Sequence, residues 1–324
     1  MKTLEIIMPH YNEDWSIVRP FFDMLSCQKH VDFSQLRVHL IHDGSDLFPK
    51  KYFANVPCTV VQTKLPHKGV SAARNYGIDH ADAKWVCFCD CDDTYANVYS
   101  LRFIFEVLGT ETRDILWGGF VMESPGPGGI ELTPHDRYDT VWIHNKYYRL
   151  DFLKDNHLYF CEDLYMSEDS AFNAIANITT TPKRIGHIKA PMPLYVWSYR
   201  EGSITLDPKR QLQNMEGHFD RNVYVLEKFR EYIHPDADLQ AGRTLTDAYT
   251  NLTRSDLPEG WEHLRDRVRE FILKEAKVLN RIKPADLERI LEASEKEAKG
   301  GGYLNPYRLD FRDWVRSITR CKTE

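Results

Sequence analysis

Short apolar runs alternate with helical repeats over the first two hundred residues. The runs predict strands at 4–8, 36–41, 58–63 and 85–89. Between them, apolar residues from Trp15 to Leu25 recur at helical spacing, with Pro20 expected to delay or kink that helix, and 70–83 predicts a second helix. Alternating strands and helices predict an α/β domain with a mainly parallel sheet covered on both faces.

The pattern changes near Pro208, after which only helical periodicity continues. A stripe from Leu212 to Phe229 predicts one helix, and three more are expected at about 236–252, 259–280 and 284–298. We therefore expect two domains, an α/β domain over 1–208 and a helical region over 209–324. The segment SPGPGG (124–129) predicts a turn or loop inside the first domain.

Composition narrows the class of protein. The chain has 324 residues, of which 42% are hydrophobic and 12% aromatic, as in a packed globular protein. A net charge of -6 gives no electrostatic reason to expect nucleic-acid binding. Seven cysteines, an odd number, argue against a disulfide scaffold, and residues 1–8 are too short and charged for a signal peptide. We expect a reduced, cytoplasmic protein.

Three polar clusters follow predicted strands. Residues 9–13 (PHYNE), 42–46 (HDGSD) and 90–93 (DCDD) each come directly after an apolar run. Any one of them could be an ordinary turn, because Asn, Asp, Gly and Ser favour turns. In an open parallel sheet, however, ligands bind beyond the carboxyl ends of the strands, so three such clusters predict a binding site at that edge.

The stretch WVCFCDCDD (85–93) carries both thiols and carboxylates. Alternation along a strand predicts that Cys87, Cys89 and Cys91 share one face, and that Asp90 and Asp92 share the other. A thiolate zinc site is the weaker reading, because structural zinc usually uses a C-x₂₋₄-C knuckle. Carboxylates suit Mg²⁺ or Mn²⁺, which also bind phosphates. A solvated acidic turn is the remaining alternative.

Seven segments, taken in order, resemble motifs of the family 2 glycosyltransferases, which have the GT-A fold. They are PHYNE (9–13), HDGS (42–45), GVSAARNYGI (69–78), FCDCDD (88–93), VWIHNKYYRLDFL (141–153), SEDSAFN (167–173) and YREGSIT (199–205). The resemblance covers residues 3–206 and implies an enzyme that transfers a sugar from a nucleotide-sugar, most often a uridine diphosphate sugar. Residues 210–324 match no known motif.

The resemblance assigns nucleotide-sugar binding to one set of residues. They are Pro9, Tyr11, Asn12 and Glu13 around the base and ribose, Asp43 at the base, Lys68 and Arg74 near the nucleotide, and Asp90, Cys91 and Asp92 toward the ribose, sugar and metal. His42 replaces the first Asp of the family's D-D-G-S motif, a departure at the base-recognition contact.

The metal and the catalytic base are also implied. Asp92 and Asp93 would hold Mn²⁺ or Mg²⁺, completed by His187, whose alternative is a structural histidine. Asp169 would be the general base, with Glu168 beside it, although both could simply cap a helix N-terminus. A single base implies one displacement and inversion at the anomeric carbon.

The acceptor side is less defined. Trp142, Lys146 and Arg200 are assigned to it, with packing and solvent exposure as the alternative for the first two. The acceptor is expected to be a glycan, a lipid-linked glycan or another polymer. The stretch 307–320 sets an apolar face beside arginines, so it predicts either peripheral membrane contact or a helix docked on the protein. Homo-oligomerisation through the helical region stays open.

The sequence therefore predicts a metal-dependent inverting glycosyltransferase. One alternative is a nucleotidyltransferase, but PHYNE occupies the place of the Gly-rich loop expected there. The other is a catalytically inactive nucleotide-sugar sensor or scaffold, against which the presence of Asp92 and Asp169 argues.

Overall fold

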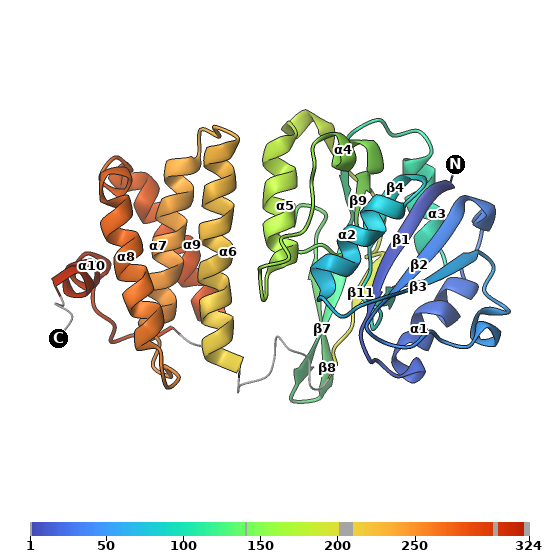
Figure 1. Cartoon of the computed structure of the whole chain (residues 1–324), viewed down its shortest axis with the longest axis horizontal. Coiled ribbons are helices and arrows are strands. Elements are labelled where there is room, and N and C mark those ends of the chain that lie inside the picture. The colour runs from blue at the N-terminus through green and yellow to red at the C-terminus, as the bar shows by residue number, and fades with distance from the viewer. Residues whose placement is uncertain (1, 140, 201–209, 301–303, 321–324) are drawn as a thin grey trace. The chain divides into compact units, whose positions relative to one another are not determined.

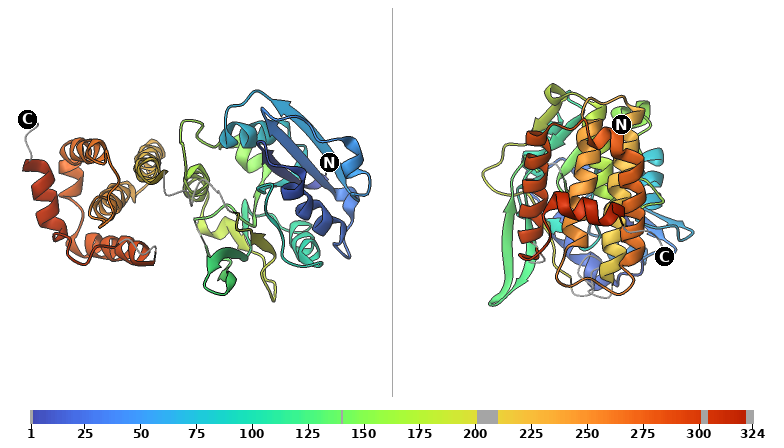
Figure 2. Two further views of the ribbon diagram at one scale, coloured as in Figure 1. Left: turned by 90° about the horizontal axis from the view of Figure 1, so that it is seen from below. Right: turned by 90° about the vertical axis from the view of Figure 1, so that its left-hand side faces the viewer.

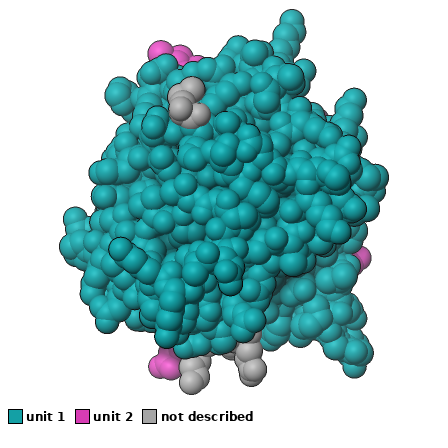
Figure 3. All heavy atoms as spheres, turned by 90° about the vertical axis from the view of Figure 1, so that its right-hand side faces the viewer, with its two compact units in different colours: residues 1–163, 168–203 teal, residues 164–167, 204–324 magenta. Residues whose placement is uncertain are grey.

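The computed structural model describes residues 2–139, 141–200, 210–300 and 304–320. The chain divides into two compact units (Figure 3), which are described separately here. Unit 1 comprises residues 1–163 and 168–203, and unit 2 comprises residues 164–167 and 204–324. The boundary expected near Pro208 lies outside the described residues.

Unit 1 is built on a seven-stranded sheet (Figure 1). Its strands are β1 (Lys2–His10), β2 (Leu36–Asp43), β3 (Thr59–Leu65), β4 (Ala83–Phe88), β6 (Ile115–Trp117), β9 (Lys146–Arg149) and β10 (Ile185–His187). Their order is β10-β6-β9-β4-β1-β2-β3, and only β9 runs antiparallel to its neighbours. The predicted mainly parallel sheet is confirmed.

Helices cover both faces of this sheet (Figures 1 and 2). The helices of unit 1 are α1 (Trp15–Ser26), α2 (Val70–His80), α3 (Ser100–Leu108), α4 (Leu150–Asp155) and α5 (Glu168–Thr179). Along β1, alternate residues point to opposite faces. Leu4, Ile6 and Met8 pack in one core cluster with α1 and α3, whereas Ile7 meets Gly77 of α2. Because both faces are buried, the strands read as continuous apolar runs.

Helix α1 runs through Pro20 rather than starting after it. Asp14 caps the helix by accepting a hydrogen bond from the Ser16 N–H (2.9 Å). Pro20 lies only one and a half turns from this end, so it removes a single intrahelical hydrogen bond. Buried Val18, Phe21 and Leu25 hold the helix against the sheet, which explains why the expected late start does not occur.

A second, four-stranded sheet in unit 1 has the order β5-β11-β7-β8. Its strands are β5 (Thr94–Tyr95), β7 (Phe120–Gly126), β8 (Gly129–His135) and β11 (Tyr195–Trp197). The turn predicted within 124–129 is present but shorter than the segment: residues 124–126 continue β7, and Pro127 and Gly128 form the turn of a hairpin. Strand β11 pairs with β5, just after the acidic stretch.

All the regular secondary structure in the described part of unit 2 is helical. It contains α6 (Gln211–Glu231), α7 (Ala237–Leu252), α8 (Glu262–Leu279), α9 (Pro284–Gly300) and α10 (Phe311–Arg320). Phe311, Trp314 and Ile318 of α10 are buried in the core of this unit, so its apolar face is docked on the protein. Within the described ranges, no helix combines the length and apolarity needed to cross a bilayer.

Candidate active site

The acidic residues lie in the turn that follows β4. The strand ends at Phe88, and the Cys89 N–H still donates to the Ile7 carbonyl of β1 (3.1 Å). The Asp93 N–H then donates to the Asp90 carbonyl (3.1 Å) and closes a tight turn. This turn therefore lies at the carboxyl edge of the parallel strands, where open α/β sheets bind ligands.

The thiols of this stretch are core side chains. Cys87, Cys89 and Cys91 are buried in one cluster with Trp85. Burial raises the pKa of each thiol above its usual value. Since the thiolate is the form that ligates metals, the carboxylates rather than the sulfurs are the candidate metal ligands.

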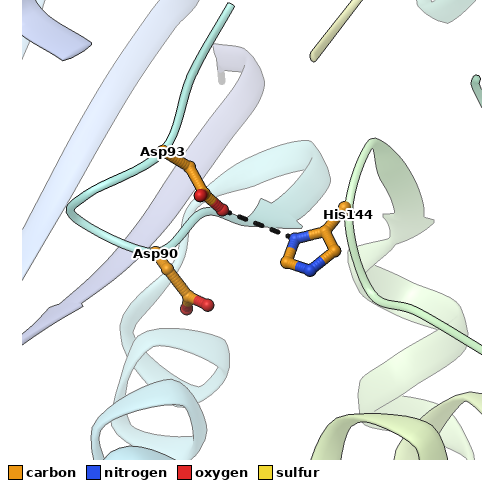
Figure 4. A group of neighbouring side chains, drawn as sticks. All are labelled: Asp90, Asp93 and His144. Carbon is orange, nitrogen blue, oxygen red and sulfur yellow. Dashed lines mark ion pairs between the residues drawn. The ribbon is translucent and has the colours of Figure 1, made fainter. Parts of the chain in front are cut away.

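Asp93 is the buried member of the acidic turn. The Tyr195 hydroxyl donates to its Oδ2 (2.6 Å) and the Ser198 N–H to its Oδ1 (2.9 Å). His144 Nδ1 lies 3.5 Å from Oδ2 (Figure 4). Burial, followed by the charges of Asp90 and Asp92, raises the pKa of Asp93 well above its usual value. Burial also lowers the pKa of His144 to about 4, so its imidazole is neutral at neutral pH.

Asp90 is joined to the predicted catalytic helix by Arg74. One nitrogen of the Arg74 guanidinium donates to Asp90 Oδ1 and the other to Glu168 Oε1, each at 2.7 Å. Arg74 is only 3% exposed, so it is not the solvated surface charge that its helical position allowed. Burial opposes ionisation of Asp90, but the charge of Arg74 outweighs it and holds the pKa of Asp90 below its usual value.

Asp92 faces a different cation. Its Oδ2 lies 2.8 Å from Arg200 Nε, and Arg200 Nη2 lies 3.6 Å from Glu13 Oε1. Burial, with the charge of Asp90, raises the pKa of Asp92, and Arg200 opposes that rise. Arg200, assigned to the acceptor side from the sequence, thus contacts two residues assigned to the donor and metal.

Asp169 and Glu168 form the first turn of α5. The Ser170 N–H donates to Asp169 Oδ1 (2.7 Å). Burial, with the charge of Glu168, raises the pKa of Asp169 to about 7. A base works best with a pKa near the operating pH. Asp169 can therefore lie in the first turn of a helix and still be suited to act as a base.

Asp43, at the end of β2, organises the loop before α2. Its carboxylate accepts hydrogen bonds from His67 Nδ1 (2.8 Å), the Lys68 N–H (2.7 Å) and the Gly69 N–H (2.9 Å). The Lys68 side chain is exposed, and only its backbone takes part in this network. Both oxygens of Asp43 are thus engaged by the protein itself, where the resemblance implied a contact with the base.

His42, which departs from the family motif, is fully buried. Gln62 Oε1 accepts from the Phe48 N–H (2.9 Å), while Gln62 Nε2 donates to the Phe48 carbonyl (3.0 Å). The same Oε1 lies 3.0 Å from His42 Nε2, so this ring nitrogen is the donor. Burial, with the charge of His10, lowers the pKa of His42 to about 4. A neutral imidazole therefore replaces an acid here.

The end of β1 supplies the remaining donor-side residues. Pro9 is buried in the strand. The half-exposed Tyr11 ring stacks on His67, with centroids 4.1 Å apart and planes at 12°. Asn12 adopts a left-handed backbone (φ 62°), and its N–H donates to Ser45 Oγ (2.7 Å), which joins the loops after β1 and β2. The structure therefore brings these strand-end clusters together.

Lys146 is the first residue of β9, and Trp142 lies four residues before it. Lys146 is buried and its Nζ donates to the Trp142 carbonyl. Burial lowers the pKa of Lys146 to about 8, so it is not an exposed surface charge. Trp142 is partly buried against Trp197, with ring centroids 4.8 Å apart.

Asp90, Asp93 and His144 form a group that could hold a cation (Figure 4). One potential ligand atom from each lies within 4.8 Å of the others, and His144 Nδ1 is buried without a hydrogen-bond partner. The two carboxylates are ligands that suit Mn²⁺ or Mg²⁺, whereas an imidazole alone would suit zinc or copper better. His187 lies outside this group: it is on β10, which β6 and β9 separate from β4, and its Nδ1 donates to the Arg137 carbonyl (2.8 Å).

Sequence reasoning missed His144, Tyr195 and Trp197. None of the three lies in a strand-end cluster, and each is brought to the acidic turn by strand pairing. His144 precedes β9, which pairs with β4, and the other two lie on β11, which pairs with β5. The usable signal was proximity to motifs, because His144 lies inside VWIHNKYYR and Trp197 lies two residues before the start of YREGSIT.

The chain is similar to a Minor teichoic acid biosynthesis protein, GgaB of Bacillus subtilis (strain 168), with 29% identity over 102 residues. That match covers 29% of this chain but only 11% of GgaB.

Two solved structures share the fold. S. aureus TarS 1–349, in complex with UDP-GlcNAc, has 20% identity and a TM-score of 0.56, covering 96% of this chain and 94% of that one. The mannosyltransferase PcManGT from Pyrobaculum calidifontis, in complex with GDP-Man and Mn²⁺, has 14% identity and a TM-score of 0.52, with 98% and 84% covered. The family model for glycosyl transferase family 2 matches residues 5–175, more than half of the chain. The chain therefore belongs to glycosyl transferase family 2, with the GT-A fold.

Proposed function

We propose that the protein transfers a sugar from a nucleoside diphosphate sugar to an acceptor hydroxyl, with inversion and with Asp169 as general base. The observation that carries the proposal is the Arg74 bridge, which joins Asp90 to Glu168, the neighbour of Asp169. The buried guanidinium of Arg74 thus ties Asp90, which we assign to the donor side, to the residue beside the proposed base. A reaction between a bound donor and an acceptor needs such fixed geometry.

The residues of the chain support a single displacement. Asp169, with a pKa of about 7, is suited to accept the proton of the acceptor hydroxyl as the new glycosidic bond forms. Glu168 is tied to Arg74 and so is held as a hydrogen-bond acceptor rather than a free nucleophile. Arg200, beside Asp92, is the cation available to the negative charge of a leaving diphosphate.

A divalent cation fits the acidic turn. Asp90, Asp93 and His144 would hold it, with Asp92 beside them, and the buried unpartnered nitrogen of His144 is the feature that favours a metal over a plain acidic turn. When bound, Mn²⁺ or Mg²⁺ supplies Lewis-acid charge that stabilises the leaving diphosphate.

We infer a uridine diphosphate sugar as donor and a surface polymer or other glycan as acceptor. TarS, which shares the fold, was solved with UDP and with UDP-GlcNAc, and GgaB is a teichoic acid biosynthesis protein. The neutral, buried His42 replaces an acid at the position that the family resemblance assigns to recognition of the nucleotide base. The identity of that nucleotide base is therefore best tested directly. PcManGT, with GDP-Man, makes guanosine sugars the necessary comparison.

Two measurements test the proposal. A thermal-shift screen of UDP-GlcNAc, UDP-glucose, UDP-galactose and GDP-mannose, with and without Mn²⁺, should give a metal-enhanced rise in melting temperature for one donor. Asp169→Asn should then lower its turnover roughly 10²–10⁴-fold without abolishing its binding. The matched control is Asp23→Asn, an exposed acid on α1, which should keep full turnover. No shift with any nucleotide-sugar would refute the proposed function.

A further inference from the structure

Two tryptophans from distant parts of unit 1 meet beside the acidic turn. Trp142 precedes β9 and Trp197 ends β11, and their ring centroids lie 4.8 Å apart with the planes at 43°. Trp197 also stacks on His144, with centroids 4.9 Å apart and planes at 24°. Both indoles are only partly buried. They form an aromatic surface that we call the indole platform, Trp142 and Trp197.

The indole platform is tied to both halves of the candidate active site. The Val141 carbonyl accepts a hydrogen bond from Asn173 Nδ2 (2.7 Å) on α5, the helix whose first turn carries Asp169. On the other side, the Ser198 N–H, next to Trp197, donates to Asp93 Oδ1 (2.9 Å). The platform is therefore anchored both to the helix of the base and to the turn of the donor carboxylates.

The indole N–H groups distinguish this pair from ordinary core tryptophans. Buried Trp85 donates its N–H to the Leu108 carbonyl (3.1 Å), and Trp117 Nε1 is buried without a partner. Among the described residues, the N–H groups of Trp142 and Trp197 have no protein acceptor, and neither is a buried unpartnered atom. Each of these tryptophans therefore combines a partly exposed apolar ring with an indole N–H that is available to donate a hydrogen bond to a ligand.

A pyranose ring is the ligand with matching chemistry. Its axial C–H groups form an apolar face that stacks on an aromatic ring, while its hydroxyls at the rim accept hydrogen bonds from an N–H. A linear polyol phosphate presents no such face. Near Trp142, the acids Asp136 and Asp139 balance the cations Arg137 and Lys146, so these residues give no excess of positive charge for a phosphate.

We propose that the indole platform binds a pyranose ring of the acceptor, so that the acceptor is a glycan ending in a pyranose rather than a bare polyol phosphate. This inference rests on the proposed function and adds the class of acceptor to it. The new glycosidic bond forms between a hydroxyl of this stacked ring and the anomeric carbon of the donor. The hydroxyl proton goes to Asp169, and the nucleoside diphosphate leaves.

Saturation-transfer NMR on the full chain, with saturating UDP and Mn²⁺, tests the platform. The probes are the methyl pyranosides of glucose, galactose, mannose and N-acetylglucosamine, compared with ribitol 5-phosphate and glycerol 3-phosphate. At least one pyranoside should receive saturation at its axial C–H protons, and neither polyol phosphate should. Trp142→Ala and Trp197→Ala should each weaken binding by roughly 30-fold, the loss typical of an aromatic anchor at a binding site.

Matched variants separate stacking from folding. Trp197→Phe keeps a ring against His144 and should retain part of the pyranoside signal. Trp261→Phe, in unit 2, should retain all of it. In the native protein, replacing UDP with the nucleotide-sugar found in the thermal-shift screen should leave the pyranoside signal, because donor and acceptor occupy different places. Loss of that signal by competition would mean that the donor sugar occupies the platform, which would overturn the assignment to the acceptor.

Other outcomes also decide the matter. Binding of a polyol phosphate but of no pyranoside, or unchanged pyranoside binding in both alanine variants, would refute the platform while leaving the proposed function intact if the donor is still hydrolysed. Failure of every nucleotide-sugar to bind or react refutes the proposed function itself. The two failures are therefore distinguishable in the same samples.

Discussion

Replacing Arg74 with methionine removes a buried cation and keeps an unbranched side chain of similar length. Arg74 donates to Asp90 and Glu168, and its guanidinium carbon lies 5.2 Å from the centroid of the Phe160 ring. In the variant, the carboxylates of Asp90 and Glu168 lose the partner that they share and face an apolar side chain. We expect a large loss of folding stability, because the fold keeps both carboxylates at their positions while the cation that compensated their burial is gone.

The magnitude follows from burial. Removing one partner of a buried ion pair typically costs about 3–5 kcal/mol. The Glu168 side chain is 14% exposed, so its pair falls near the lower end of that range, whereas the Asp90 side chain is 35% exposed and water screens its pair. We therefore expect the free energy of unfolding to fall by about 3 kcal/mol at pH 7.

Urea unfolding followed by tryptophan fluorescence measures this loss. Of the seven tryptophans, five lie in unit 1, so the signal reports mainly the unit that contains Arg74. The matched control is Arg19→Met, which removes an exposed pair with Asp23 on α1 (2.9 Å). An exposed i,i+4 pair contributes about 0.3–0.5 kcal/mol. The free energy of unfolding of Arg19→Met should therefore differ from that of the native protein by no more than this amount.

The pH dependence gives the sharper test. In the native protein the pKa of Asp90 is lowered, so its contribution to stability is present above the unfolded value of 3.8 and is lost as pH falls through the folded value. In Arg74→Met, burial acts on Asp90 without the opposing charge of Arg74, so the pKa of Asp90 should rise and Asp90 should protonate at a higher pH. The stability gap should therefore narrow as pH falls from 7 toward 4. A gap below 1 kcal/mol at pH 7, or one that does not change with pH, would refute the reasoning.

Three further predictions concern the base, the buried acid and the packing of α2. Donor turnover should rise with pH through about 7 and then level off, because Asp169 acts as a base only when deprotonated, and a flat profile from pH 5 to 9 would contradict this. Tyr195→Phe should cost about 1–3 kcal/mol in urea unfolding by removing a donor to a buried carboxylate, while exposed Tyr138→Phe should be neutral. Gly77→Ala should cost about 1–3 kcal/mol, since its Cβ would lie 2.4 Å from a β1 side chain, whereas Gly128→Ala meets open space; equal melting temperatures would exclude this.

The sequence predicted the frame of the site well. Strands β1 to β4, helices α1 and α2 and the helical C-terminal region follow from apolar periodicity, because burial sets that period directly. The meeting of the clusters after β1, β2 and β4 follows from the rule that parallel strands share a carboxyl edge. The hydrogen bond from the Asn12 N–H to Ser45 Oγ (2.7 Å) joins the clusters after β1 and β2, as that rule predicts.

The partners of each charge could not be read from the sequence. Strand order depends on non-local pairing, so nothing local indicated that β10, with His187, lies three positions from β4 while His144 lies next to Asp93. Likewise, a helical arginine such as Arg74 has the same spacing whether it faces water or two acids. Hydrophobic pattern locates faces, but the identity of a buried charge partner is decided by tertiary packing.

The pairing of β5 with β11 has a consequence for how the protein is assembled. Tyr95 and Tyr195 are matched across a separation of a hundred positions, and the residues just after β11 hold Asp92 and Asp93. Contacts this distant in sequence form late, since a long loop must close before they contribute. On the ribosome, the acidic turn therefore emerges about a hundred residues before the chain that fixes it, and ligand-binding competence should be among the last properties that the growing protein acquires.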